Sequence, residues 1–351
     1  MQIQENVQLA PYTTFKIGGP AKYFCIVKNQ FDALEAYEFA EKNNLKTFVL
    51  GGGSNILISD TGFNGLVIKV VNKGIEILKE SENEVLLSVA SGEVWDDVVK
   101  FAVINNWWGI ENLSHIPGSS GAIAVQNVGA YGQEASKVIK FVTVFDKDTH
   151  QILTFPNSEC GFAYRKSIFN YEKKGKYIIF NIGLTLIKNG KPNLTYRDLQ
   201  AKFKDTLPTL LEIRTEVISI RDKKYPFPTV AVKGNAGSFF KNPILDKQQY
   251  NNLAQLILAK FGSDQYNNLE NKKFVENDVI KVPAALLIDI CGLKGIASGG
   301  ALINQSQPLV IINETGRATS TDVLTLANLV KTNVLNKTNI ELKFEPELIG
   351  F

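Results

Sequence analysis

The hydrophobic pattern near the N-terminus predicts a small α/β arrangement. Residues 21–29 are mostly apolar and rich in strand-forming residues, and residues 46–50 form a second short apolar run. Between these two runs, apolar residues recur at the i, i+3, i+4, i+7 spacing of a helix, at Ala33, Ala36, Tyr37 and Ala40. A further apolar triplet at 56–58 follows a run of glycines. The predicted order over 20–60 is therefore strand, helix, strand, turn and strand.

The next part of the chain, 65–190, is predicted to be mainly β-structure with one helix. Residues 93–106 have the pattern of an amphipathic helix whose apolar side chains include Trp95, Val98 and Ala102. Residues 141–155 form two β-rich runs joined by a polar turn, which predicts a hairpin. The segment 111–134 has many small residues and no clear period, and it is too long for a connection without a role.

The pattern changes again after Tyr225-Pro226-Phe227-Pro228, which we interpret as a boundary. Two helices are predicted at 248–261 and 283–291, separated by a polar stretch at 262–277. A last helix near 321–336 precedes a final strand in the C-terminal twelve residues. We found no internal repeats.

Composition excludes several classes of chemistry. The chain has 351 residues, a net charge of +3, two histidines and three cysteines. Cys25, Cys160 and Cys291 are far apart, and neither His115 nor His150 has a ligand-type partner nearby in sequence, so we expect no structural zinc or iron–sulfur site. The odd cysteine count favours a reducing compartment, the cytoplasm. We expect no signal peptide, no membrane span and, because the lysines are dispersed, no nucleic-acid track.

A run of glycines follows the second predicted strand. Successive backbone N–H groups in such a loop form an anion-binding nest suited to a pyrophosphate. The loop is not a Walker motif, because it has no GK[ST], and it leads into a strand rather than into the helix of a dinucleotide fingerprint. A tight β-turn without a ligand is the alternative. The loop consists of Gly51, Gly52, Gly53, Ser54 and Asn55.

The segment 111–134 has the residue types of a slot for a flat heteroaromatic group. Small residues let a ring lie against the backbone, and Ser, Gln and Asn supply donors and acceptors for its polar edge. A glycine-rich domain junction remains the alternative. The candidate residues are Pro117, Gly118, Ser119, Ser120, Gly121, Gln126, Asn127, Gly129, Ala130, Tyr131 and Gly132.

Five motifs occur in order along the chain. They are Gly51–Asn55, PGSSGAIAVQNVGAYGQE from Pro117, FAYRKS from Phe162, GNAGSFFKNP from Gly234 and EPE from Glu345. In this order they resemble one enzyme family, the UDP-N-acetylenolpyruvoylglucosamine reductases, also called UDP-N-acetylmuramate dehydrogenases. The resemblance covers nearly the whole chain, and 194–199 is similar to the branch with a tyrosine-bearing substrate loop.

The resemblance implies an α+β fold, with an FAD-binding part similar to the vanillyl-alcohol-oxidase type. It implies non-covalent FAD, NADPH as the hydride donor and UDP-N-acetylglucosamine enolpyruvate as the substrate. The reaction implied by the resemblance would pass a hydride from flavin N5 to the terminal vinyl carbon and a proton to the adjacent carbon, giving UDP-N-acetylmuramate for peptidoglycan synthesis. The expected parts are FAD subdomains at 1–64 and 65–220, a substrate domain at 221–318 and a returning C-terminal helix and strand at 319–351.

The resemblance also assigns site residues. Arg165 would stabilise the enolate, Ser238 would donate the proton, and Glu347 would be the catalytic carboxylate, with Glu345 as its rival two positions away. Residues expected at the substrate are Tyr164, Tyr196, Lys224, Asn242 and Gln307.

Two other functions were weighed. A catalytically silent UDP-sugar-binding protein would have lost Arg165, Ser238 or Glu347, and all three are present. A flavin oxidase with covalently attached FAD would often use a histidine or cysteine, but neither histidine lies in an evident attachment motif.

Overall fold

A computed structural model describes residues 1–224, 227–228, 233–276 and 278–351. Tyr225 and Pro226 of the predicted boundary and Asn277 of the polar stretch lie outside these residues. Contacts divide the chain into two compact units, which are described separately below. The first consists of Met1–Gln8, Pro20–Gly53 and Phe63–Thr229, and the second of Leu9–Gly19, Ser54–Gly62 and Val230–Phe351. The four-part division expected from the sequence stays a prediction.

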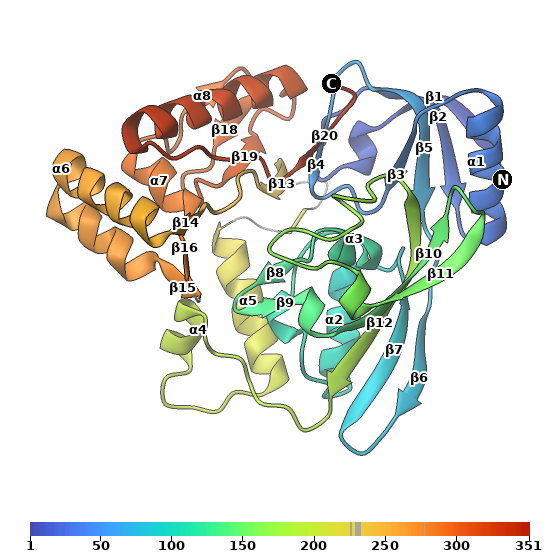
Figure 1. Ribbon diagram of the computed structural model, residues 1–351, viewed down its shortest axis with the longest axis horizontal. Coiled ribbons are helices and arrows are strands. Elements are labelled where there is room, and N and C mark those ends of the chain that lie inside the picture. The colour runs from blue at the N-terminus through green and yellow to red at the C-terminus, as the bar shows by residue number, and fades with distance from the viewer. Residues whose placement is uncertain (225–226, 229–232, 277) are drawn as a thin grey trace. The chain divides into compact units, whose positions relative to one another are not determined.

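The first sheet of the first unit confirms the predicted strand, helix and strand. Its order is β1-β2-β5-β3, and the last three strands are parallel. The helix α1 (Gln30–Lys42) packs its predicted apolar residues against one face of the sheet (Figure 1). Asn29 caps this helix by accepting hydrogen bonds from two backbone N–H groups. The strands are β1 (Ile3–Gln8), β2 (Pro20–Val27), β3 (Thr47–Leu50) and β5 (Phe63–Val70).

The second sheet of this unit is antiparallel and has the order β11-β10-β12-β7-β6. The predicted hairpin is its β10–β11 pair, and the predicted amphipathic helix is α2 (Trp95–Ile104), whose apolar residues join the core beside the sheet. The strands are β6 (Ile75–Glu80), β7 (Glu84–Ala90), β10 (Ile139–Asp146), β11 (Gln151–Pro156) and β12 (Tyr177–Ile187).

The segment 111–134 forms short elements. They are a 3-10 turn at Glu111–Leu113, α3 (Ser120–Val125), β8 (Gly129–Ala130) and β9 (Gln133–Glu134). Two helices that the sequence pattern did not predict complete the unit, α4 (Arg197–Lys202) and α5 (Leu210–Lys224). Short 3-10 turns also occur at Ala135–Lys137 and Asn157–Glu159.

The second unit contains a four-stranded antiparallel sheet of order β13-β19-β18-β17, a small sheet of order β14-β16-β15 and the parallel pair β20-β4. The strands are β4 (Ile56–Ile58), β13 (Gly234–Ser238), β14 (Ile244–Asp246), β15 (Phe274–Glu276), β16 (Val279–Lys281), β17 (Ala297–Ser298), β18 (Ala301–Ile303), β19 (Val310–Asn313) and β20 (Glu347–Ile349). A 3-10 turn at Ala10–Tyr12 also belongs to this unit.

Helices of the second unit differ from the prediction at one place. The polar stretch expected to separate two helices continues the first of them, so that α6 spans Lys247–Lys272. Gly262 interrupts it with φ 84° and ψ 175°, a conformation that only glycine adopts readily, and the helix kinks there. The helices α7 (Ala284–Ile290) and α8 (Ser320–Thr338) agree with the predictions.

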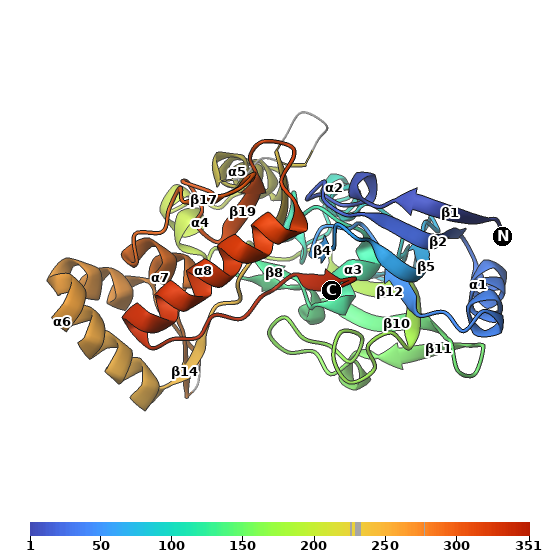
Figure 2. The same cartoon turned by 90° about the horizontal axis from the view of Figure 1, so that it is seen from above.

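The three helices α6, α7 and α8 share one hydrophobic core with the second unit's sheets (Figure 2). Phe239 and Phe240 are buried in this core and make edge-on contacts with each other and with neighbouring rings. The predicted final strand is shorter than expected, because Ile340–Phe344 form no continuous ladder. Among the described residues, no helix is both long and apolar enough to cross a membrane.

Candidate functional site

The glycine loop after β3 packs backbone to backbone against the segment 117–121. A Cβ atom on Gly52 would lie 2.5 Å from the Cα of Gly118 and 2.7 Å from the backbone nitrogen of Ser119. Gly51 also faces this segment, where its Cβ would meet the Ser119 hydroxyl at 2.8 Å. A close approach of two backbones requires residues without side chains. The structure thus brings together the two segments predicted to hold the cofactor.

The same loop presents backbone donors that have no protein acceptor. Within the part of the chain that the structure describes, the N–H groups of Gly52 and Gly53 donate no hydrogen bond, and Gly53 is buried. Buried N–H groups are nearly always paired, so these donors indicate a ligand with acceptor oxygens. A flavin dinucleotide pyrophosphate has such oxygens, so the residues present fit FAD.

The segment 126–132 contacts the turn that carries Arg165. Ala163 and Lys166 exchange both backbone hydrogen bonds at 3.0 Å and leave Tyr164 and Arg165 at the tip of the turn. The Arg165 guanidinium donates to the carbonyl of Gly129 at 2.9 Å. The side-chain amide of Asn127 donates to the carbonyl of Ala163 at 3.0 Å. These bonds fix the predicted catalytic arginine beside the predicted ring-binding segment.

Tyr131, Tyr196 and Lys224 form a second cluster in the same unit. The two tyrosine rings are edge-on with centroids 4.9 Å apart, and the Lys224 ammonium lies 5.7 Å from each centroid. The Lys224 ammonium also contacts a carboxylate oxygen of Asp198 at 3.2 Å. An anionic ligand of Lys224 would therefore compete with Asp198. The sequence predicted Tyr196 and Lys224 as substrate residues, but it gave no signal for Asp198.

In the second unit, the structure brings the segments of Ser238 and Glu347 side by side. Ser238 ends β13, and the next residue, Phe239, accepts a hydrogen bond at 3.0 Å from the backbone N–H of Glu345. Glu347 begins β20 and donates its backbone N–H to the carbonyl of Asn55 at 3.0 Å. Asn55 in turn donates its side-chain amide to the carbonyl of Glu345 at 3.2 Å.

The remaining predicted residues of the second unit have different surroundings. Gln307 lies in the turn before β19, and its carbonyl accepts from the N–H of Val310, the residue paired with Ser238. The Asn242 side-chain oxygen accepts from the backbone N–H of Ala284 at 2.9 Å, at the start of α7. The Asn242 side chain therefore holds the start of α7, in addition to its predicted contact with the substrate.

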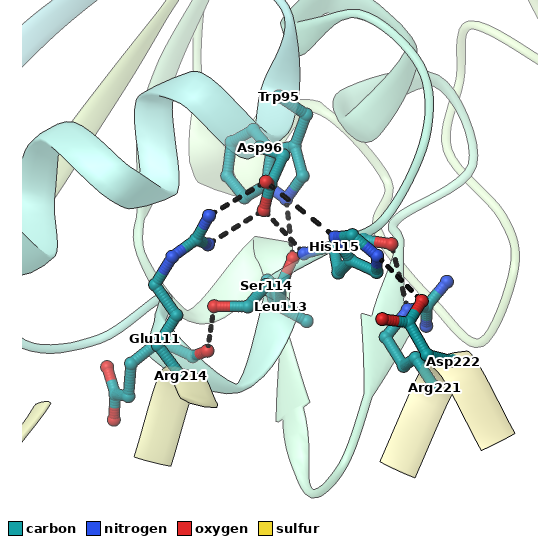
Figure 3. A network of polar contacts seen from close by, with 9 residues as sticks. All are labelled: Trp95, Asp96, Glu111, Leu113, Ser114, His115, Arg214, Arg221 and Asp222. Atoms are coloured by element: carbon teal, nitrogen blue, oxygen red, sulfur yellow. Dashed lines mark hydrogen bonds and ion pairs between the residues drawn. The ribbon is translucent and has the colours of Figure 1, made fainter. Parts of the chain in front are cut away.

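Sequence reasoning missed a polar network that holds the segment 111–115 between two helices (Figure 3). Asp96 on α2 accepts two hydrogen bonds from the Arg214 guanidinium on α5, at 2.7 and 2.8 Å, and a third from the backbone N–H of His115. Arg221 donates to the carbonyl of His115 at 2.8 Å, and the His115 ring contacts Asp222 at 3.0 Å. The segment 117–121 follows directly, so this network positions the loop that packs against Gly52.

A signal for this network was present in the sequence. The chain has five arginines, and two of them, Arg214 and Arg221, are seven residues apart. That spacing places both on one face of a helix, and both are nearly buried. Buried arginines are almost always paired with a carboxylate or with carbonyls, which predicts partners on a neighbouring element.

Several known proteins are similar to this chain over nearly its whole length. A UDP-N-acetylenolpyruvoylglucosamine reductase of Neisseria meningitidis serogroup A is 38% identical over 348 residues, which cover 98% of this chain and 96% of the relative. One from Aliivibrio fischeri is 39% identical, covering 98% and 94%, and one from Flavobacterium johnsoniae is 37% identical, covering 99% and 100%. The chain belongs to the UDP-N-acetylenolpyruvoylglucosamine reductase family.

Two family models and one crystal structure agree with this membership. The model described as the UDP-N-acetylenolpyruvoylglucosamine reductase C-terminal domain matches 228–349, and an FAD binding domain matches 21–154. The crystal structure of the Thermus caldophilus reductase has a TM-score of 0.68 at 24% identity and covers 99% of both chains, which shows a common fold. The predicted family, the α+β fold class and the FAD cofactor are confirmed. The roles of single residues stay predictions.

Replacing Gly52 by alanine tests the packing of the two loops. The added Cβ would collide with the Gly118 backbone, which cannot move without separating the loops, at a cost of about 1–3 kcal/mol. We expect FAD affinity to fall by about an order of magnitude or more, measured as bound flavin per protein. Gly51→Ala is the matched control, because its Cβ meets the Ser119 hydroxyl, which can rotate, and its loss should be smaller. Equal loading of both variants would contradict the account.

The Asp96 network should make the first unit acid-sensitive. Burial by itself would raise the pKa of Asp96, but the hydrogen bonds from Arg214 and from the His115 N–H hold that pKa below its ordinary value. The stabilisation is thus complete above the ordinary aspartate pKa of about 3.9 and is lost as pH falls through the lower folded-state value. Asp96→Asn should cost about 3 kcal/mol at pH 7, because it leaves Arg214 unpaired.

The measurement is urea unfolding followed by fluorescence, since Trp95, Trp107 and Trp108 all lie in the first unit. The difference between Asp96→Asn and wild type should shrink as pH falls below about 4. Asp97→Asn, at the exposed neighbouring position on α2, is the control and should change little. A deficit of the same size at pH 7 and at pH 3.5 would refute the role of the Asp96 charge.

Proposed function

We propose that this chain reduces UDP-N-acetylglucosamine enolpyruvate to UDP-N-acetylmuramate, with NADPH as the hydride donor, in the synthesis of peptidoglycan precursors. The observation that carries the proposal is the similarity to reductases of that name over 98% of the chain. One family model matches the FAD-binding part and another matches the C-terminal part. The chain therefore has a domain for the cofactor and a domain for the substrate.

The glycine loop and the segment 117–121 are the residues that would hold the FAD pyrophosphate. The N–H groups of Gly52 and Gly53, which have no acceptor among the described residues, would supply donors without any charged side chain, and the chain contains no arginine before Arg165. When bound by these residues, FAD would supply the hydride-transfer chemistry between NADPH and the substrate. Polar groups of Gln126 would bind the edge of the ring system. The Asn127 side chain, predicted for the same role, is buried and already bonds the Ala163 carbonyl and the Ser136 N–H.

Arg165 would stabilise the negative charge that develops on the substrate carboxylate. Hydride addition to the vinyl group makes an enolate, and a fixed cation beside its oxygens lowers that barrier. A guanidinium is always charged and can hold a carboxylate through two hydrogen bonds. The bond to the Gly129 carbonyl and the contact with the Tyr164 ring, 5.1 Å away, restrict the side chain before substrate arrives.

Ser238 would donate the proton, and Glu347 would act with it. A serine hydroxyl is a weak acid, so it protonates only a strongly basic carbon such as that of an enolate, and its position matters more than its acidity. Glu347 would orient the enol form or return a proton to the serine. We assign this role to Glu347 rather than to Glu345, because Glu347 is the residue that aligns with the catalytic carboxylate of the family motif. The backbone pairing that joins Ser238's strand to the Glu345–Glu347 segment supports a common role.

Lys224 and Tyr196 would bind the diphosphate of the substrate. The Lys224 ammonium lies over the rings of Tyr131 and Tyr196 and would offer its positive charge and its N–H donors to phosphate oxygens, and the Tyr196 hydroxyl would offer a further donor. Tyr164 would lie near the nicotinamide and the substrate. Asn242 would polarise the Ser238 hydroxyl or hold the substrate, and Gln307 would contact the sugar or uridine side. These remain proposals that rest on the family motifs.

We place the reaction in the cytoplasm. All three cysteines are buried free thiols, as is usual where glutathione and thioredoxin keep thiols reduced. The partners we propose are the small molecules of the reaction, NADPH and the UDP-sugar, and neither a nucleic acid nor a membrane.

Replacing Ser238 by alanine separates the two half-reactions. Reduction of bound FAD by NADPH needs no proton from this hydroxyl and should continue near the wild-type rate. Reoxidation by the enolpyruvyl substrate should fall about a hundredfold or more, the usual contribution of a positioned acid. Both rates are measured by anaerobic stopped-flow absorbance of the flavin. Ser298→Ala, on the far edge strand of the same sheet, is the control. Equal slowing of both half-reactions would rule out the proton-donor role.

A further inference from the structure

Lys69 is a partly buried cation beside the glycine loop that the reaction described above does not use. It lies on the central strand β5, directly across from Leu50, the last residue of the parallel strand β3. Leu66, Ile68 and Val70 of β5 face helix α1, so Lys69 points to the opposite face of the sheet. Its side chain therefore lies under the point where β3 leads into Gly51.

The Lys69 ammonium donates a hydrogen bond to the carbonyl oxygen of Gly51. No carboxylate of the described chain lies within ion-pair distance of it, in contrast to the nearby Lys73, which pairs with Glu93 at 3.3 Å. Burial, followed by the charge of Lys73, lowers the pKa of the Lys69 ammonium. A partly buried ammonium with a neutral carbonyl as its protein partner is costly unless an anion completes the site.

The contact with Gly51 also determines the direction of the next N–H group. In a planar trans peptide, the carbonyl oxygen and the following N–H point in opposite directions, and the described chain contains no cis peptide. Because the Gly51 oxygen points to Lys69, the Gly52 N–H points away from it. That N–H is one of the donors without a protein acceptor.

We propose that Lys69 is a positioning residue for the flavin pyrophosphate, which orients and polarises the Gly51–Gly52 peptide so that the Gly52 N–H is presented to the anion. The proposal rests on the function proposed above. The ammonium acts through the peptide rather than by touching the phosphate, and its charge strengthens the hydrogen bond on the other side. It also supplies positive charge to a cofactor region that contains no arginine.

The test is the affinity of the flavin-free full-length chain for FAD, measured by quenching of flavin fluorescence. We expect Lys69→Met to raise the Kd by about ten- to a hundredfold, the range for hydrogen bonds that involve a charged group. Lys69→Arg keeps the charge and a donor and should stay within about threefold of wild type. Lys73→Met removes the same unit of charge from an exposed ion pair and should change the Kd by less than about twofold.

A second readout separates this role from a structural one. Without flavin, Lys69→Met removes an ammonium that has no carboxylate partner among the described residues, so the melting temperature of the flavin-free protein should not fall. The rise in melting temperature on adding FAD should become smaller than in wild type. A variant that binds FAD like wild type would overturn the proposal. So would one whose flavin-free form melts clearly lower and whose FAD-induced rise is unchanged.

The outcome for the wild-type chain distinguishes this proposal from the proposed function. If wild type binds FAD tightly and Lys69→Met does too, the role of Lys69 is wrong and the function stands. If the wild-type chain takes up no FAD, the proposed function fails, and the Lys69 proposal fails with it.

Discussion

The close approach of Gly52 to the backbone of Gly118 is the constraint on which the cofactor region depends. It ties the carboxyl end of a parallel strand to the start of the small-residue segment 117–121. Behind that segment, the carbonyl of Gly118 accepts from the N–H of Trp95 at 3.0 Å, at the first residue of α2. The segment 117–121 is thus held on one side by the loop at the end of β3 and on the other by the first residue of α2.

Charge is distributed unevenly around this constraint. The groups of the loop that would hold a pyrophosphate are backbone dipoles, with one lysine ammonium bonded to the Gly51 carbonyl. Stronger, fixed cations follow later in the chain, where Arg165 and Lys224 are each held by a defined partner, the Gly129 carbonyl and Asp198. In the proposed reaction, negative charge develops on the substrate, and a fixed cation stabilises that charge. The pyrophosphate of a bound cofactor carries the same charge throughout, so it has less need of one. The arginines of α5 have yet another role, since Arg214 and Arg221 hold the segment before the loop.

Local pattern was enough to predict most of the elements. The helix α1, the hairpin β10–β11 and the helix α8 have periodic apolar residues that decide their type. The polar stretch after Gly262 was wrongly separated from α6, because its helical residues bury few apolar side chains and a glycine breaks the pattern. The helix α5 was not predicted, although its buried apolar residues recur at helical spacing, at Leu210, Ile213, Val217 and Ile220. Its other two buried positions are arginines.

The candidate site was predictable where a motif is contiguous and unpredictable where a contact is made across the fold. Gly51–Gly53 and Pro117–Gly121 were predicted to hold the cofactor, and the structure packs the two segments against each other. Their contact with the cofactor stays a prediction. Lys69 and Asp198 were not recognised, because a single lysine in a strand or aspartate at a helix start has no distinctive neighbours in sequence. Their importance comes from the group opposite each of them, the Gly51 carbonyl and the Lys224 ammonium.

The central claim is that FAD bound by this chain passes a hydride from NADPH to the enolpyruvyl sugar. Anaerobic absorbance spectroscopy of the purified wild-type protein tests it most directly. The account predicts a yellow protein whose flavin absorbance bleaches with NADPH and returns when UDP-N-acetylglucosamine enolpyruvate is added. A protein that purifies without flavin and stays colourless with added FAD would contradict it. So would a reduced flavin that the enolpyruvyl substrate does not reoxidise.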